Sequence, residues 1–229
     1  MEPLRLALEA LGLNVLLPLD VAAFDAAAAP LRLEALLASP GGALVVGAGG
    51  RPFFQGFVAS PEARDGEGHP LDRYTARVIA AAVSGALAGT GIRHAIGYPF
   101  GVEPFIPFQR LGRAAGLGGP GPLALQIHPV FGPWWAYRAL IVLDRRFGPA
   151  PVLGDACAGC PAPCVAACPG GAVNRAGFQI AACHAHRVAA DECRLSCAAR
   201  IACIRGPEHR YADEQLAFHM RASMPRPGA

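Results

Sequence analysis

Apolar and polar positions alternate with Gly- and Pro-rich breaks over the first 150 residues of the chain. Leu4, Leu8 and Leu11 follow helical spacing and predict a helix over residues 3–12. Further helices are predicted over residues 31–37, 71–87 and 105–115. Short apolar runs bounded by turn residues predict strands over residues 14–17, 43–46, 92–96, 123–127 and 139–143. This alternation predicts a layered domain of sheet and helices.

A change in composition near residue 150 predicts a domain boundary. Pro149, Pro151 and Gly154 interrupt the chain, and frequent Gly, Pro and Cys residues then leave little regular structure before a helix predicted over residues 213–222. We therefore expect three parts: a sheet-and-helix domain over residues 1–150, a small module over 155–207, and a closing helix with a frayed tail over 208–229.

All eight cysteines of the chain lie in the small module. Four form a compact group and four follow at wider spacing, in the order Cys157, Cys160, Cys164, Cys168, Cys183, Cys193, Cys197 and Cys203. Disulfides that stabilise a secreted domain would be spread more widely along the chain. Thiols crowded in this way favour ligation of a metal or a cluster in a reducing compartment. We therefore expect a cytoplasmic protein.

The compact cysteine group resembles the cysteine run of bacterial ferredoxins. It differs from that run by one extra residue between Cys160 and Cys164, and Pro169 follows its fourth cysteine. Eight thiolates suit two 4Fe-4S clusters, and in ferredoxins the fourth cysteine of a run binds the other cluster. The resemblance therefore predicts one cluster on Cys157, Cys160, Cys164 and Cys203, and a second on Cys168, Cys183, Cys193 and Cys197.

Two structural zinc sites, each with four cysteines, are the alternative to clusters. Zinc sites usually contain paired Cys-x-x-Cys knuckles, and here only Cys157 and Cys160 form one. The Cys168-Pro169 step is also more typical of ferredoxins than of zinc ribbons. The spacing therefore favours clusters over zinc.

Charge and hydropathy add expectations about partners. Of the 229 residues, 53% are hydrophobic and 16% are charged, with a formal net charge of +3, and the basic residues are arginines scattered among acids. This distribution does not suggest binding to nucleic acid. No apolar run reaches the roughly 18 residues of a membrane span, and Glu2 and Glu9 lie where a signal peptide would be basic and then apolar. We expect no membrane association, and the sequence leaves the oligomeric state open.

A second concentration of distinctive side chains lies between His128 and Arg138. This segment follows a predicted strand and combines an imidazole, several aromatic rings and a guanidinium. In a structural interpretation, Trp134, Trp135 and Tyr137 anchor the core. His128 is then a buried imidazole with a hydrogen-bond partner, and Arg138 pairs with a carboxylate. In a functional interpretation, these side chains line a pocket for a large flat ligand.

The segment from Leu125 to Leu143, with its Ile-His-Pro, Phe-Gly, Trp-Ala and Arg-Ala pattern, resembles the type C cobalamin-processing chaperone of animals. Tyr211, Glu214 and Gln215 resemble the closing helix of that family. The chaperone lacks a cysteine module. The order of the cysteines here resembles the cobalamin-dependent epoxyqueuosine reductases and reductive dehalogenases, which fuse a related cobalamin domain to two 4Fe-4S clusters. Over about residues 90–219 the chain looks like a compact member of this superfamily.

The resemblance implies an α+β protein with a nitroreductase-like cobalamin-binding domain and a C-terminal ferredoxin-like module. Its cofactors would be two 4Fe-4S clusters and cobalamin. The activity implied is that of an oxidoreductase that delivers electrons from the clusters to a bound corrinoid. An external low-potential donor, such as a flavodoxin, a ferredoxin or a flavin reductase, would supply the electrons. The alternative is a non-catalytic cobalamin chaperone or electron-transfer protein.

Seven residues are then expected to contact the corrinoid. The aromatic side chains would shield the corrin from water, and they are Phe131, Trp134, Trp135 and Tyr137. His128 and Arg138 would hydrogen-bond its amide rim, and Gly132 would permit close approach of the backbone. The sequence offers no counterpart of the reductases' acidic catalytic residue, so no catalytic residue is predicted.

Overall fold

The computed structural model describes residues 1–148, 151 and 153–224 of the chain. The chain forms two compact units, the first made of Met1–Leu117 with Trp135–Val152 and the second of Gly118–Trp134 with Leu153–Ala229. Residues 118–134 thus belong to the same unit as the cysteines, whereas the sequence placed them in the expected sheet-and-helix domain over residues 1–150. Pro149, which contributed to that expected boundary, and the tail expected to fray over 225–229 lie outside the described residues.

The first unit contains a four-stranded sheet in which every neighbouring pair is antiparallel. Its order is β1-β2-β4-β3, with the strands β1 (Val15–Leu19), β2 (Gly42–Gly49), β3 (His94–Gly97) and β4 (Trp135–Leu143). All residues of β2 are buried. This explains its unbroken apolar sequence, because a strand covered on both faces has no solvent side. The expected combination of helices with a sheet is confirmed as a mixed fold around a small antiparallel sheet.

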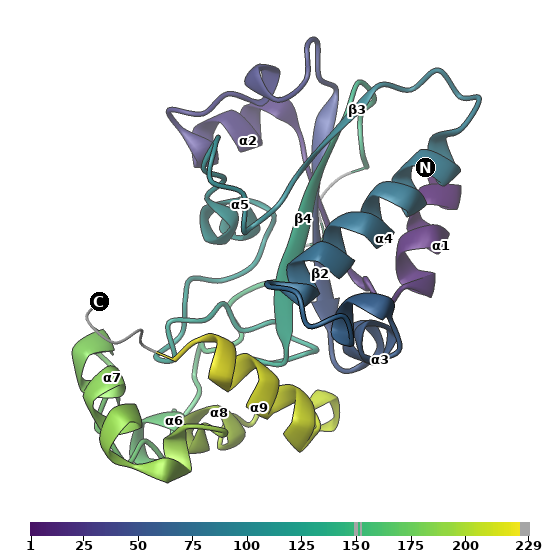
Figure 1. Cartoon of the computed structure of the whole chain (residues 1–229). Helices are drawn as coiled ribbons and strands as arrows, with labels where there is room; N and C mark the ends of the chain where they lie inside the picture. The colour runs from purple at the N-terminus through teal and green to yellow at the C-terminus, as the bar shows by residue number, and fades with distance from the viewer. Residues whose placement is uncertain (149–150, 152, 225–229) are drawn as a thin grey trace. The chain divides into compact units, whose positions relative to one another are not determined.

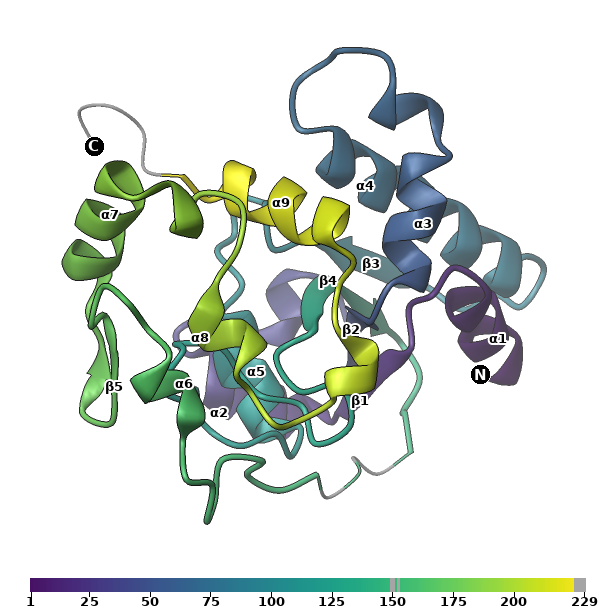
Figure 2. The ribbon, with the colours of Figure 1, turned by 90° about the horizontal axis from the view of Figure 1, so that it is seen from below.

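Helices cover both faces of this sheet (Figures 1 and 2). One face carries α1 (Glu2–Ala10), α3 (Pro52–Val58) and α4 (Pro70–Leu87), and the other carries α2 (Val21–Ala28) and α5 (Phe108–Ala114). Two 3-10 turns, η1 (Leu33–Ala35) and η2 (Pro61–Ala63), join these elements. Helix α1 packs against α4, and α2 packs against α5.

The second unit consists of short helices and one small hairpin (Figure 2). Its helices are α6 (Pro163–Ala166), α7 (Ile180–Ala189), α8 (Ala198–Ile201) and α9 (Asp213–Ala222), with the 3-10 turns η3 (Asp191–Cys193) and η4 (Pro207–His209). Strands β5 (Val173–Asn174) and β6 (Gly177–Phe178) form the hairpin. An apolar cluster holds the two segments of the unit together, because Leu123 and Ile127 pack with Ala156, Val173 and Ala199.

Several predicted elements differ from the observed ones. The strand predicted over 123–127 is wrong, because Ala124 has a φ of 57° and the amide of Gly121 bonds the carbonyl of Leu125, which makes a tight turn. The helix predicted over 31–37 is reduced to η1. Helices α2, α3 and α7 were not predicted. The helix predicted over 213–222 coincides with α9.

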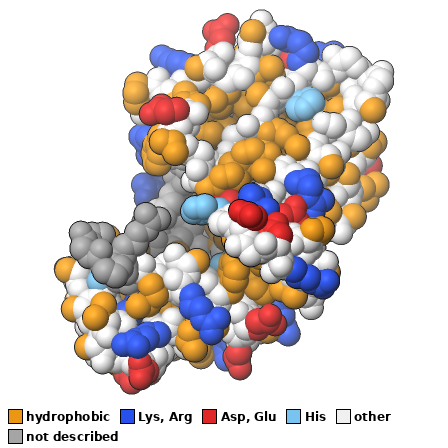
Figure 3. All heavy atoms as spheres, in the orientation of Figure 1, with side chains coloured by type: hydrophobic (Ala, Val, Ile, Leu, Met, Phe, Trp, Pro, Cys, Tyr) orange, Lys and Arg blue, Asp and Glu red, His pale blue; other side chains and the backbone are white. Residues whose placement is uncertain are grey.

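Charged side chains of both signs are interspersed over the face drawn in Figure 3. In the first unit Arg73 pairs with Asp65 and Arg93 with Asp144. Among the described residues, no helix is both long and apolar enough to cross a bilayer.

Candidate metal centres

Four cysteines of the second unit line one cavity of about 60 Å³, and they are Cys157, Cys160, Cys164 and Cys203. We call them the first set. The first two lie in the loop before α6, the third lies on α6 and the last follows α8. Helices α6 and α8 pack against each other. This contact returns Cys203 to thiols that come much earlier in the sequence.

The extra residue between Cys160 and Cys164 is accommodated by a left-handed backbone conformation. Ala162 has a φ of 58° and precedes Pro163, which occupies the first turn of α6. The amide of Ala162 donates to the sulfur of Cys160 over 3.4 Å. Since proline suits the first turn of a helix, the chain enters α6 directly and Cys164 lines the same cavity as Cys160.

The other four cysteines line a separate cavity of about 310 Å³ in the same unit, and they are Cys168, Cys183, Cys193 and Cys197. We call them the second set. Cys168 follows α6, Cys183 lies on α7, Cys193 ends η3, and Cys197 is the residue that precedes the first turn of α8. Helix α7 and η3 pack together, which brings Cys183 and Cys193 to one cavity.

The two sets have the same membership as the two groups expected from the ferredoxin-like spacing. Cys164 and Cys168 are four residues apart but line different cavities, because α6 ends between them at Ala166. Leu123 lines both cavities. Within residues 1–148, 151 and 153–224, no three His, Cys, Asp or Glu side chains converge as closely as a single metal ion requires. Each set instead surrounds a hollow.

Burial disfavours the charged form of these thiols. It raises the pKa of Cys157 to about 11, and Asp155 and the other thiols of the first set act in the same direction. Burial is also the largest cause of the raised pKa values of Cys164, Cys183, Cys193 and Cys203. The thiolate is the metal ligand, and the positive charge of a bound metal deprotonates it. Binding of a metal by these sulfurs would therefore release protons.

His128 closes a tight loop in the second unit. Its backbone amide and carbonyl exchange hydrogen bonds with Gly132 over 2.9 and 2.8 Å. Its Nδ1 accepts from the amides of Val130 and Phe131 over 3.1 and 3.2 Å. Burial lowers the pKa of His128 to about 4, and His209 acts in the same direction. The imidazole is therefore neutral at pH 7 and carries its proton on Nε2.

Gly132 and Gly206 allow two stretches of backbone to touch within the second unit. Gly132 has a φ of 57°, and a Cβ there would lie 1.9 Å from the carbonyl oxygen of Arg205. Gly206 has a φ of 59°, and a Cβ there would lie 2.5 Å from the carbonyl oxygen of Val130. The close approach at Gly132 is thus made to the segment that follows Cys203. This contact holds the loop after His128 against the segment that follows the candidate ligand Cys203.

Trp134 is fully buried in the core of the second unit. Its ring meets that of Tyr211 edge-on, with 5.5 Å between centroids. The guanidinium of Arg200 lies 4.9 Å from the ring of Trp134 and 4.8 Å from that of Tyr211. Leu216 of α9 packs in the same cluster. Trp134 therefore acts as a core anchor that holds α9, which is what the structural interpretation of this segment expected.

A β-bulge marks the place of Arg138 in the first unit. Val46 of β2 faces Ala139 of β4, whereas the next residue, Gly47, faces Tyr137. Arg138 is therefore the extra residue that the bulge inserts into β4. Bulges bend a strand and redirect a side chain, and they are frequent beside functional sites.

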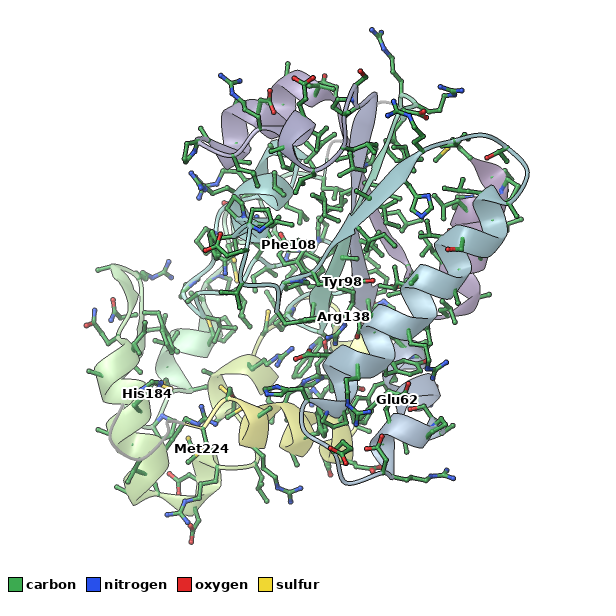
Figure 4. The ribbon with its side chains drawn as sticks, turned by 45° about the horizontal axis from the view of Figure 1, so that its top comes forward. Glu62, Tyr98, Phe108, Arg138, His184 and Met224 are labelled. Atoms are coloured by element: carbon green, nitrogen blue, oxygen red, sulfur yellow. The ribbon has the colours of Figure 1, made fainter. Side chains whose placement is uncertain are left out.

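The three candidate residues of β4 have contacts within the first unit. The rings of Trp135 and Tyr137 meet edge-on, with 4.5 Å between centroids. Tyr137 also packs on Phe108 of α5 at 5.5 Å, and burial raises the pKa of Tyr137. The guanidinium of Arg138 lies 5.2 Å from the ring of Phe53 on α3. Arg138 and Phe108 are labelled in Figure 4.

Asp72 on α4 is the carboxylate that the charge of Arg138 influences. Burial raises the pKa of Asp72, and His69 and Arg138 oppose that rise. Nδ1 of His69 lies 3.8 Å from a carboxylate oxygen of Asp72. The charge of Arg138 therefore acts on a carboxyl group of the first unit, and the pairing of Arg138 with an acid stays a prediction.

Comparison with known proteins gives structural matches only. No family model matches the chain, and no curated protein matches it in sequence. A selenomethionine-labelled epoxyqueuosine reductase has a TM-score of 0.61 at 14% identity, over 94% of this chain and 68% of that protein. The epoxyqueuosine reductase of Bacillus subtilis has a TM-score of 0.57 at 14% identity, over 93% and 66%. The B12-trafficking protein CblC of C. elegans has a TM-score of 0.53 at 14% identity, over 90% and 85%.

The chain has the fold of epoxyqueuosine reductase and of CblC. The superfamily resemblance noted in the sequence is thus confirmed at the level of the fold. The chain spans about two thirds of the length of the reductases and most of the length of CblC. At 14% identity the likeness concerns the fold alone.

Within this epoxyqueuosine reductase fold, several residues that sequence reasoning missed also line the cavities, and Leu123, Arg205 and Arg187 are three of them. Leu123 was assigned to a strand, and nothing in its surroundings indicated that it lies between two thiol sets. Arg205 lines the first cavity, and the sequence around it also gave no indication of this position. Arg187 could have been found, because it follows Cys183 by four positions on α7, and such residues share one face of a helix. His184, labelled in Figure 4, lies on α7 and does not line either cysteine cavity.

Proposed function

We propose that the chain is an iron-sulfur, corrinoid-dependent reductase. The observation that carries this proposal is the division of eight cysteines into two sets of four, each around its own cavity. Four thiolates are the usual ligand set of a 4Fe-4S cluster. When bound, the clusters would supply electrons one at a time and the cobalt of the corrinoid would supply the reductive chemistry.

The residues around the cysteines support this use. Three cysteines of the first set, Cys157, Cys164 and Cys203, pack in an apolar cluster that includes Leu123, Ile127 and Ala199. Cys168 and Cys197 of the second set pack against the same cluster. Apolar surroundings exclude water and disfavour the added negative charge of a reduced cluster. They therefore lower the reduction potential of the cluster. A low potential is what reduction of a corrinoid requires. Leu123 lines both cavities and would leave a short apolar gap for electrons to cross.

The segment from His128 to Arg138 is proposed to contact the corrinoid in a nitroreductase-like domain. Three of its seven candidate residues are partly exposed and able to touch a ligand directly: Phe131, Tyr137 and Arg138. The other four are buried and would support them: His128, Gly132, Trp134 and Trp135. Arg138 would donate to the amide rim from its bulge, where the strand redirects its side chain.

Electrons are proposed to come from an external low-potential donor such as a flavodoxin, a ferredoxin or a flavin reductase. The cytoplasm is the proposed compartment, since eight free thiols and oxygen-sensitive clusters require a reducing environment. In this proposal the protein acts without nucleic acid or a membrane.

Metal and sulfide analysis of the anaerobically purified chain, with its absorption spectrum, tests the cluster half of the proposal. We expect about eight irons and as many acid-labile sulfides per chain, with broad absorption bleached by dithionite. Two zinc ions and no sulfide would contradict it and would favour the structural zinc sites instead.

Titration with hydroxocobalamin tests the corrinoid half. We expect a shift of the corrinoid absorption bands on binding, weakened by Arg138→Met. Arg93→Met is the matched control, because Arg93 is an arginine of the same unit that pairs with Asp144 away from the candidate segment. If the wild-type chain left the corrinoid absorption spectrum unchanged, the corrinoid half of the proposal would be contradicted. The cluster half would stand.

A corrinoid carrier is the second candidate, because the chain covers 85% of CblC and only about two thirds of the reductases. Turnover separates the two functions. A reductase converts cyanocobalamin, an alkylcobalamin or an epoxide substrate under low-potential reduction and releases product repeatedly. A carrier binds the corrinoid in a one-to-one ratio and releases it unchanged.

A further inference from the structure

Arg187 is a buried cation at the wall of the second cysteine cavity. It lies on α7, four residues after Cys183, and lines the cavity together with the second set. Only 6% of the residue is exposed to solvent. Arg187 therefore places a positive charge in the wall of a cavity that is lined by four thiols.

The guanidinium of Arg187 bonds main-chain oxygens from two different parts of the unit. Its Nε donates to the carbonyl of Cys193 over 3.2 Å. Its Nη2 donates to the carbonyl of Met220 over 2.5 Å, and its Nη1 donates to that of Ser223 over 2.9 Å. One side chain thus joins the loop that holds Cys193 to the C-terminal end of α9.

No carboxylate in the described part of the chain pairs with Arg187. A buried charge without a counter-charge is costly, and carbonyl dipoles offset that cost only in part. Arg200 lines the same cavity, but its guanidinium is held over the rings of Trp134 and Tyr211. A cluster bound by four thiolates carries a net negative charge. Such a cluster in the second set would supply the counter-charge that Arg187 lacks.

We propose that Arg187 is a positioning residue that raises the reduction potential of the cluster in the second set and fixes its Cys193 loop to α9. This inference rests on the proposed iron-sulfur function. On reduction the cluster takes one electron from the external low-potential donor, and no bond forms or breaks. The added negative charge is stabilised by the nearby guanidinium, because the two charges interact in surroundings that screen them poorly.

Potentiometric titration of the reconstituted full chain, followed by electron paramagnetic resonance, tests this inference. Arg187→Met should lower the equilibrium constant for reducing one of the two clusters at least tenfold, which is about 59 mV for one electron. The other cluster should keep its potential. Arg194→Met is the matched control, since Arg194 adjoins Cys193 but is exposed and pairs with Asp191, and it should shift neither potential appreciably.

Arg187→Lys separates charge from hydrogen bonding. Lysine keeps the positive charge but lacks the planar set of donors that reaches three carbonyls at once. Its cluster potential should lie between those of the wild type and Arg187→Met. Hydrogen exchange of the amides over 216–224 should be faster than in the wild type, because α9 has lost its bonds to Arg187.

The outcomes distinguish this inference from the function on which it rests. A wild-type chain without iron and sulfide would defeat the proposed function itself. Two assembled clusters with wild-type potentials in Arg187→Met would overturn the inference alone. If Arg187→Met assembles only one cluster, Arg187→Lys provides the test. A wild-type reduction potential in Arg187→Lys, together with wild-type hydrogen exchange over 216–224, would overturn the role given to Arg187.

Discussion

A single added carbon atom at Gly132 would collide with the backbone of Arg205. Alanine at this position would place its Cβ 1.9 Å from a carbonyl oxygen, which neither segment can avoid without moving. We expect Gly132→Ala to lower the free energy of unfolding of the second unit and its iron content, because Arg205 follows Cys203. Chemical denaturation monitored by circular dichroism, with iron analysis, measures both effects.

Gly171→Ala is the control for that substitution. Gly171 also has a positive φ, of 61°, but a Cβ there would meet nothing within 4 Å. Both variants therefore carry the left-handed penalty of roughly 1–2 kcal/mol, and only Gly132→Ala adds a collision. Equal loss of stability in the two variants would show that the contact between the two backbones contributes nothing.

The neutral imidazole of His128 should make the chain sensitive to acid. The unfolded chain takes up a proton below the ordinary histidine pKa near 6.5, whereas folded His128 resists protonation down to a pKa of about 4. Between these values the unfolded state binds more protons, so stability falls as the pH falls. The expected loss from this group is roughly 1–2 kcal/mol between pH 7 and pH 5.

His128→Asn isolates this contribution. The asparagine oxygen can still accept from the amides of Val130 and Phe131, but it does not titrate. Urea midpoints at pH 7 and pH 5 should therefore fall less in His128→Asn than in the wild type. A parallel fall in the two proteins would contradict the buried, neutral state of His128.

At the scale of elements, the second unit is built so that helices sort the cysteines. Cys164 and Cys203 reach one cavity through the packing of α6 and α8, whereas Cys193 reaches the other through α7 and η3. Cys164→Ala and Cys203→Ala should therefore each remove the same four irons or so, and the double variant should lose no more. Cys164→Ala combined with Cys193→Ala should lose nearly all iron. Iron and sulfide analysis of the single and double variants measures this.

The iron lost by the double variants shows which cysteines share a cluster. If Cys203→Ala combined with Cys193→Ala removed no more iron than either single change, these two cysteines would serve one cluster. The division into the first and second sets would then be incorrect, although the presence of clusters would stand. Electron paramagnetic resonance of the single variants would show which cluster signal each one retains.

The sequence was most informative about elements where one local signal dominates. The ends of α4 and α9 followed from helix punctuation. The cysteine spacing groups the thiols as the two cavities do, whereas their role as cluster ligands stays a prediction. Sequence reasoning failed where conformation depends on distant contacts. Ala124 and Gly132 adopt their left-handed conformations in turns that are fixed by residues elsewhere in the second unit. Arg138 lies at a bulge that depends on the register with β2, which no pattern within β4 encodes.

At the scale of the whole molecule, the chain crosses between its two units at Trp134 and Trp135, which are adjacent in sequence. Trp134 is buried with Tyr211 in the second unit, whereas Trp135 lies on β4 in the first. A dipeptide that looks like one aromatic feature in the sequence thus serves two cores. Segment 118–134 depends for its packing on the cysteine unit, through Leu123 and Ile127.

Removal of the metal should therefore unfold one unit and spare the other. Because the binding energy of ligated metal is also folding energy, a unit of short helices around eight thiols is expected to lose its order when the clusters are stripped. Hydrogen-deuterium exchange after oxidation and chelation should show faster exchange over 118–134 and 153–224. Strands β2 and β4 should keep their protection, since their antiparallel ladder and apolar core contain no cysteine. Protection that persisted over 118–134 together with β4 would mean that this segment folds with the sheet, and the assignment of Trp134 to the cysteine unit would fail.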